Sequence, residues 1–204
     1  MCVFFFGCVI FFINSRRYER GHWDAVIVKY KEMELFHETE QLSRTSCDML
    51  QRIRDHLVSR DHVATDGTWL PAHAIELHPE GELRAHVDSV RFSGGLVAGL
   101  SLGCPSLMRL RPPEADADET DRETICSDDD DDNNNKQINN NNHDQFGYVD
   151  LFLPPRSLYA LTGKSRYDYT HELLPHQSIF EGTGESVHRN KHRWSIIFRD
   201  AKED

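Results

Sequence analysis

Residues 70–111 read LPAHAIELHPEGELRAHVDSVRFSGGLVAGLSLGCPSLMRLR, and this stretch decides the fold class. Short runs of alternating apolar residues are separated by glycine and proline, a pattern that predicts strands joined by turns. We predict strands at 70–78, 82–92, 96–102 and 106–111, with the first turn at Pro79-Glu80-Gly81. Many short strands with turns at intervals of roughly 8–12 residues are typical of an all-β sandwich or barrel.

The flanking regions extend this pattern and add one helix. In residues 39–58 apolar side chains recur at helical spacing, which predicts an amphipathic helix. Further strands are predicted at 24–30, 148–153, 157–162, 166–174 and 192–199. The expected fold class is therefore mainly β with an N-terminal helical element.

Residues 112–147 differ in composition from the rest of the chain. They contain five consecutive aspartates followed by asparagine-rich tracts, and they cannot bury enough apolar surface to offset their ordering entropy. We predict a disordered acidic and Asn-rich insertion. Its segment 114–132 holds eleven acidic residues and one basic residue. Of the chain's 34 acidic and 23 basic residues, 23 acidic and 22 basic ones therefore lie outside this segment. The net charge of −11 therefore belongs to the insertion, and it indicates no overall basic surface for nucleic acid.

Residues 1–15 form an apolar leader of uncertain status, and residues 16–204 are predicted to form a single domain that includes the insertion. The apolar run ends at Ile13, which is too short for a membrane-spanning helix of ~20 residues. It also lacks the positive start of a secretory signal. A short membrane-inserting signal is one interpretation. The other, which we favour, is a misplaced translation start or a fragment that replaces the true N-terminus. We expect no stable membrane association.

The motif His86-Val87-Asp88 carries the most chemical information. Residues i and i+2 of a strand point to the same face, so an imidazole and a carboxylate can meet one ion. His171, on another predicted strand, would complete a 2-His-1-carboxylate facial triad, which leaves positions on iron(II) for a co-substrate and dioxygen. A second H-x-D, at residues 22–24, precedes the predicted helix, and we interpret it as a structural or surface feature.

The last predicted strand presents Arg193 and Arg199, which are an even number of residues apart and so share one face. Their Cα atoms should lie roughly 20 Å apart. Two long side chains reaching inward would leave a gap about the size of a small dicarboxylate, a group that guanidinium binds with good charge and geometry. The alternative for either arginine is a solvated charge on an edge strand.

The motifs HVDSVRF, AGLSLGCPSLMRL, SLYALTGKSRYDYTHE and RWSIIFR occur in the order found in AlkB-like dioxygenases. The chain resembles this family, in particular its mitochondrial subgroup known as AlkB homologue seven. The resemblance implies a double-stranded β-helix (jelly roll) and an enzyme that uses Fe(II), 2-oxoglutarate and dioxygen for hydroxylation or demethylation. It also implies a mitochondrial location. By resemblance the iron ligands are His86, Asp88 and His171, and the co-substrate contacts are Tyr159, Arg193 and Arg199.

Several positions depart from the family pattern. Ile75 and Leu77 stand where many relatives have an N-x-Y motif, and Ser195 stands where many have asparagine. The subgroup also lacks the lid that grips nucleotides in base-repair members. We therefore expect a protein or other non-duplex substrate. A nucleic-acid demethylase is the alternative within the enzyme class, and a non-catalytic interaction protein that retains the fold is the alternative from another class.

A hydrolase motif offers a different interpretation of the chain. Residues 99–103, GLSLG, match G-x-S-x-G, in which a serine nucleophile sits on a sharp turn between a strand and a helix. Here Cys104-Pro105 and another strand-like run follow. We therefore interpret Ser101 as an ordinary strand residue.

Overall fold

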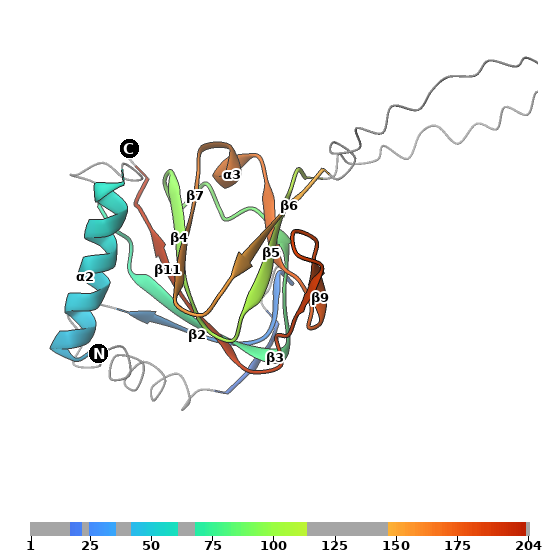
Figure 1. The fold of residues 1–204 in the computed structure, drawn as a ribbon. Coiled ribbons are helices and arrows are strands. Elements are labelled where there is room, and N and C mark those ends of the chain that lie inside the picture. The colour runs from blue at the N-terminus through green and yellow to red at the C-terminus, as the bar shows by residue number, and fades with distance from the viewer. Residues whose placement is uncertain (1–16, 22–24, 36–41, 61–67, 114–146, 203–204) are drawn as a thin grey trace, which may run out of the picture.

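The computed structural model of the chain describes residues 17–21, 25–35, 42–60, 68–113 and 147–202. The leader, most of the acidic insertion and the second H-x-D motif lie outside these residues. The described strands form one nine-stranded antiparallel sheet, which curves into a barrel-like shape, and one separate two-stranded hairpin (Figure 1). The sheet contains β1 (Glu19–Gly21), β2 (Ile27–Leu35), β3 (Ala72–His86), β4 (Leu96–Gly103), β5 (Ser106–Arg111), β6 (Val149–Leu153), β7 (Ser157–Thr162), β8 (Thr170–Leu173) and β11 (Arg193–Arg199), and the hairpin contains β9 (Ser178–Phe180) and β10 (Glu185–Val187).

The long strand β3 joins two layers of the sheet. Its first half pairs with β11, where Leu77 is opposite Arg193, and its second half pairs with β8, where His86 is opposite His171. One layer therefore continues as β11-β4-β7 and the other as β8-β5-β6. This arrangement agrees with the jelly roll implied by the resemblance, and it places β8 and β11 on opposite sides of the interior.

The predicted turn at Pro79-Glu80-Gly81 is wrong, because β3 runs through these residues without reversing. The partner strand β2 has a matching irregularity, where Lys29 adopts a positive φ of 53° and the register shifts between Val28 and Tyr30. β3 bends here (Figure 1), and its pairing with β2 is interrupted between Leu77 and Glu82 and continues on both sides. A Cβ at Gly81 would lie 2.8 Å from the Lys29 carbonyl oxygen, so only glycine permits this close approach.

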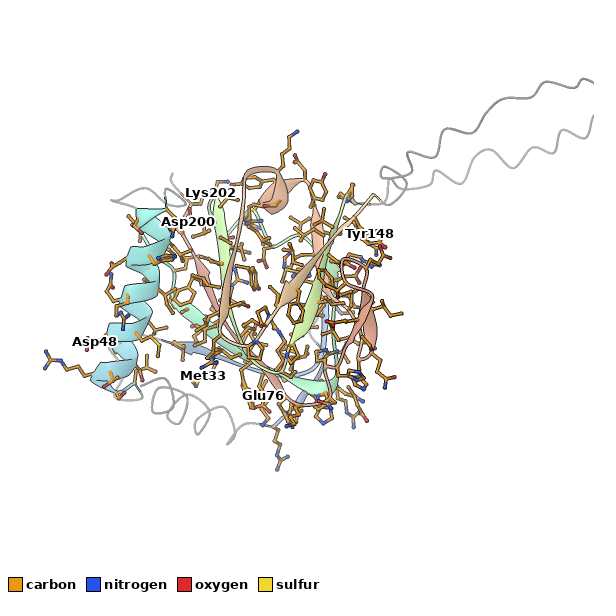
Figure 2. All side chains as sticks on the ribbon, in the orientation of Figure 1. Met33, Asp48, Glu76, Tyr148, Asp200 and Lys202 are labelled. Carbon is orange, nitrogen blue, oxygen red and sulfur yellow. The ribbon has the colours of Figure 1, made fainter. Side chains whose placement is uncertain are left out.

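The predicted helix is confirmed as α2 (Arg44–Ser59), and the first residues of the prediction lie outside the described part of the chain. Ser43 caps its N-terminus by accepting a hydrogen bond from the Ser46 backbone N–H. The buried side chains Leu50 and Leu57 pack against the outer face of the sheet, where Met33 lies between helix and strands (Figure 2). Neither α2 nor the second described helix, α3 (Gly163–Tyr167), is long and apolar enough to cross a membrane.

A second apolar cluster lies between the two layers. Its buried members come from both sides and include Met108, Leu173 and Ile197. The helix α3 directly precedes β8, in a segment where the sequence predicted only a strand from residue 166. That prediction is therefore right for residues 170–173 and wrong for 166–167.

Candidate functional site

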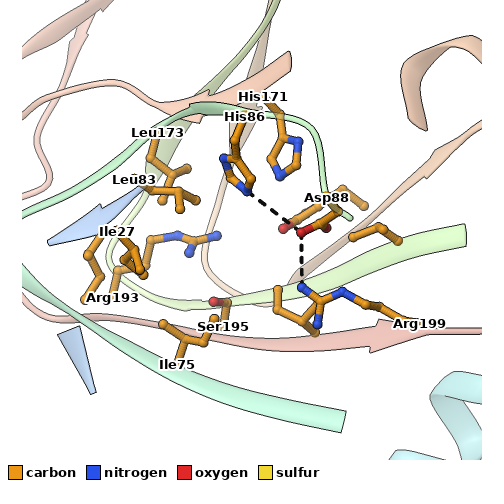
Figure 3. Close-up of a pocket in the computed structure, with 14 residues that line it drawn as sticks. Ile27, Ile75, Leu83, His86, Asp88, His171, Leu173, Arg193, Ser195 and Arg199 are labelled. Atoms are coloured by element: carbon orange, nitrogen blue, oxygen red, sulfur yellow. Dashed lines mark hydrogen bonds and ion pairs between the residues drawn. The ribbon is translucent and has the colours of Figure 1, made fainter. Parts of the chain in front are cut away.

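A cavity of about 60 Å³ opens between the two layers, and the predicted site residues line it (Figure 3). One end holds ionisable side chains from the end of β3 and from β8, and β11 forms the opposite wall. The lining residues named in the sequence prediction are His86, Asp88, Tyr159, His171, Arg193 and Arg199. The fold therefore brings together all six residues that the sequence singled out.

The first three of these form a compact cluster. Ligand atoms of His86, Asp88 and His171 all lie within 4.8 Å of one another, and no other group of three or more such side chains within that range occurs among the described residues. The two imidazole rings are 4.2 Å apart between centroids. The set contains two nitrogen donors and one carboxylate, which is the donor set of the facial triad for iron(II).

One part of the sequence argument is wrong. Asp88 was expected to share a strand face with His86, but β3 ends at His86 and Asp88 lies in the segment that follows. The His86 Nε2 and Asp88 Oδ1 atoms are nevertheless 3.8 Å apart. Contacts outside the strand must therefore hold Asp88 in position.

A hydrogen bond sets the tautomer of His86. The His86 Nδ1 lies 2.8 Å from the Arg84 carbonyl oxygen. Because a carbonyl oxygen only accepts, Nδ1 carries the proton and Nε2 of the neutral ring keeps a free lone pair. Such outer contacts orient histidine ligands in metal sites.

The protonation states of the cluster also suit a cation. Burial acts to raise the pKa of Asp88, but the charges of Arg199, His171 and His86 outweigh it, so this pKa lies below its usual range. Burial is the main cause that lowers the pKa of His171 to about 4, followed by repulsion from His86. At neutral pH the cluster thus offers a carboxylate and a neutral imidazole, the forms that bind divalent metals.

The other end of the cavity contains a buried cation. Arg193 is only 3 % exposed, and its Nε and Nη2 atoms have no hydrogen-bond partner among the described residues. The Tyr159 hydroxyl lies close to this guanidinium, and its oxygen can accept a hydrogen bond from it. A buried charge without a counter-ion costs free energy, and an incoming carboxylate would offset that cost. This end of the cavity therefore fits one carboxylate of a dicarboxylic acid.

Tyr159 reaches the cavity because its cross-strand partner is Gly99. A Cβ at Gly99 would lie 2.3 Å from the Tyr159 hydroxyl, so any larger residue would displace the ring. Burial raises the pKa of Tyr159, and the phenol stays protonated and able to donate. Gly99 was not predicted as a site residue, although a glycine within an alternating strand is a signal of close approach.

Arg199 lies beside the three-residue cluster. Its Nη2 atom is 3.3 Å from Asp88 Oδ1, so in this structure the guanidinium is paired with the carboxylate of the cluster. Ser195 lies between the two arginines along β11 and also lines the cavity (Figure 3). The geometry therefore orders the polar groups along one strand, from Arg193 through Ser195 to Arg199.

The hydrolase interpretation gains no support among the described residues. Ser101 is fully buried in the middle of β4, which continues as a strand instead of turning into a helix. Histidines outside the cluster have other contacts: His73 is paired with Glu32 and Glu34, His192 with Glu76, and His176 contacts the ring of His188.

Residues 14–199 match the sequence model of the family described as the 2OG-Fe(II) oxygenase superfamily. The chain belongs to this superfamily. It is an Fe(II)- and 2-oxoglutarate-dependent dioxygenase. The donor set of the cluster fits the metal, and the Arg193 nitrogens that lack a partner among the described residues fit a carboxylate of the co-substrate.

Two relatives are similar over most of the chain. The Mus musculus protein named alpha-ketoglutarate-dependent dioxygenase alkB homolog 7, mitochondrial, is 33 % identical over 94 % of this chain and 69 % of its own length. The Bos taurus protein of the same name is 30 % identical over the same shares. The resemblance to the AlkB-like family is thereby confirmed.

Solved structures support the fold. A prolyl-4-hydroxylase from Pseudomonas putida matches with a TM-score of 0.52 at 11 % identity, over 97 % of this chain and 83 % of its own. A prolyl hydroxylase from Trichoplax adhaerens, solved with a peptide fragment of hypoxia inducible factor, matches with a TM-score of 0.54 at 12 % identity, over 96 % and 74 %. At these identities the likeness concerns the jelly-roll fold.

The depressed pKa of His171 predicts a pH dependence of stability in the metal-free dioxygenase. Between pH 6.5 and about 4, His171 is protonated in the unfolded chain and neutral in the folded protein. The unfolded state then binds more protons, so the free energy of unfolding rises with pH and is lost as the pH falls through this window. Urea unfolding across these pH values should show that the free energy of unfolding depends more steeply on pH in the wild type than in His171→Asn. Parallel curves for the two proteins would contradict the burial of a neutral imidazole.

Proposed function

We propose that His86, Asp88 and His171 hold the iron of this dioxygenase, and that Arg193, Arg199 and Tyr159 hold 2-oxoglutarate. One observation carries the proposal: a three-ligand cluster lines one end of the cavity and a buried guanidinium lines the other. Two nitrogens of this guanidinium have no hydrogen-bond partner in the part of the chain that the structure describes. We further propose that these residues act within one domain spanning residues 16–204.

The bound iron would supply the oxidising chemistry, in which 2-oxoglutarate and dioxygen become succinate and carbon dioxide while one oxygen atom enters a substrate C–H bond. The residues of this chain place the reactants. Arg193 pairs with the distal carboxylate through its free Nε–H and Nη2–H, and the Tyr159 hydroxyl donates a further hydrogen bond. The apolar wall formed by Ile75, Leu83 and Ile197 keeps water away from the reacting end.

Arg199 has a second task in this proposal. In the present arrangement it neutralises Asp88, which would otherwise be a partly buried carboxylate beside a cavity. When a cation binds the cluster, the pairing is no longer required to balance that charge. The guanidinium is then available to the carboxylate at the metal end of the co-substrate.

We propose a protein segment as the substrate, and two charges near the cavity support this choice. Glu32 lies opposite Ile75 in the β2-β3 pair and Glu34 lies opposite His73, so both acids share the sheet face that lines the cavity. Their side chains are 34 % and 49 % exposed. A nucleic-acid backbone brought to this face would place phosphates near carboxylates.

The substrate class can be tested with iron-loaded protein, 2-oxoglutarate and dioxygen. We expect succinate formation to rise above the substrate-free rate with unfolded proteins or peptide pools, and the modified peptides to gain the mass of one oxygen atom. The same assay with methylated single-stranded RNA and DNA should show no stimulation. Stimulation by methylated strands, with binding that weakens steeply as salt is raised, would instead support a demethylase.

We also propose that the protein works in mitochondria, since both similar relatives carry that location in their names. Cell fractionation of the full chain with a C-terminal tag tests this. Recovery with the matrix proteins is the expected result, and recovery only in the cytosolic fraction would contradict it.

A further inference from the structure

Asp88 needs support from outside its own strand, because β3 ends two residues before it. Residues 88 and 89 lie outside the strands, so their carbonyl oxygens are not part of the hydrogen-bond pattern of the sheet. A carboxylate ligand on an unsupported segment would lose its placement to ordinary backbone motion, so the structure that fixes this segment also fixes one metal ligand.

The contacts of one arginine provide that support. Arg166, on α3, donates from Nη1 to the Asp88 carbonyl oxygen at 2.9 Å, and from Nη2 to the Ser89 carbonyl oxygen at 3.3 Å. Its Nη2 also lies 2.8 Å from the Ser93 Oγ, which in turn donates to the Ser89 carbonyl oxygen at 3.0 Å. The planar guanidinium thus forms hydrogen bonds near both ends of the segment 88–93.

The position of Arg166 in the chain adds a second link. It is 2 % exposed, among the largest fully buried side chains, and α3 leads directly into β8, which carries His171. One side chain therefore ties the segment of Asp88 to the segment of His171. Burying a guanidinium whose described acceptors are two backbone carbonyls and one hydroxyl is costly. An apolar side chain would fill the space at lower cost unless placement of these groups is needed.

We infer that Arg166 is a positioning residue for the metal centre, which sets the distance between Asp88 and the two histidines and thereby the affinity for the metal. This inference rests on the proposed ligands. Arg166 touches neither metal nor co-substrate, and it acts through the backbone of Asp88.

The chain contains a matched control, Arg189. This arginine is 3 % exposed and donates to two backbone carbonyls, those of His78 at 3.2 Å and Gly81 at 2.8 Å. As in Arg166, its Nε has no partner among the described residues. Arg189, however, binds the backbone at the bend of β3 and not the segment that carries Asp88. The same substitution at the two sites therefore separates the loss of a buried arginine from the loss of ligand placement.

The test measures binding of Co(II) to metal-free protein by calorimetry and by the visible Co(II) spectrum, without co-substrate or turnover. We expect Arg166→Met to weaken binding by ~10- to 100-fold, the usual cost of losing an outer-shell contact. Arg189→Met should stay within about 3-fold of wild type. Arg166→Lys should bind with intermediate affinity and an altered spectrum. Equal affinity in Arg166→Met and Arg189→Met would overturn the inference.

Two further variants keep the outcomes separate. Ser93→Ala removes only one partner of Arg166, so it decides the question if the arginine variants do not fold: several-fold weaker binding supports the inference, and wild-type affinity refutes it. Asp88→Ala tests the ligand assignment itself. If Asp88→Ala binds Co(II) as tightly as wild type, the proposed triad fails, whereas a loss in Asp88→Ala with none in the Arg166 variants rejects only the positioning role.

Discussion

Replacing His171 with alanine is expected to weaken Fe(II) binding on the order of 10²-fold or more and to abolish 2-oxoglutarate turnover. The metal would keep only His86 and Asp88 among the proposed ligands. For comparison, structural zinc sites with four protein ligands bind with roughly 10–16 kcal/mol, which is ~3 kcal/mol per ligand. His171 is 6 % exposed, so water would have to enter a closed site to replace it.

The measurement is an anaerobic titration of 2-oxoglutarate into iron(II)-loaded protein, followed by the visible metal-to-ligand charge-transfer band. The wild type should give a saturable band, and His171→Ala should give none. His176→Ala is the matched control, because His176 is exposed and contacts the ring of His188 away from the cluster. A band of wild-type size in His171→Ala would remove this residue from the proposed triad.

Replacing Arg193 with methionine is expected to weaken 2-oxoglutarate binding on the order of 10²-fold, which corresponds to ~3 kcal/mol for one partner of a buried, hydrogen-bonded charge pair. The same change should leave the stability of the ligand-free protein unchanged or higher. Arg193 is a buried cation, and two of its nitrogens have no hydrogen-bond partner among the residues that the structure describes. Burial lowers its pKa, so its removal relieves an unfavourable burial.

Weaker co-substrate binding together with unchanged or higher stability would identify Arg193 as a residue that serves ligand binding and not folding. Calorimetric titration of 2-oxoglutarate into the Mn(II)-loaded protein gives the affinity, and urea unfolding of the metal-free protein gives the stability. Arg193→Lys serves as a control that keeps the charge but loses the two-pronged geometry, and it should bind with intermediate affinity. If Arg193→Met instead destabilises the free protein strongly and binds the co-substrate normally, Arg193 is a structural residue.

Strand positions were predictable where local alternation was the only signal required. The strand expected at residues 106–111 is β5 and the one at 157–162 is β7, both with the predicted bounds. The bounds of α2 were shifted by a few residues, which is usual where caps decide helix ends. The helix α3 was missed because five residues are too few to display a helical period.

The bend of β3 could not be predicted from its own residues. Pro79 and Gly81 are turn formers, and locally they predict a reversal of the chain. The strand continues because Lys29 on the neighbouring strand takes up the irregularity and because Arg189 binds the carbonyls of His78 and Gly81. Both partners are far away in the sequence, and their effect exists only in the folded sheet.

From the sequence alone came the chemistry of the proposed site: two histidines and a carboxylate for a metal, and two arginines for a dicarboxylate. Side-chain types suggest the metal donors, and the two-residue period of a strand puts both arginines on one face, because both are local properties. The placement of the carboxylate was decided by tertiary packing. Asp88 lies beyond the strand that was expected to hold it, and Arg166, from a helix formed much later in the chain, binds its backbone. The reason is that a buried carbonyl must find a donor, and which donor reaches it depends on how distant segments pack.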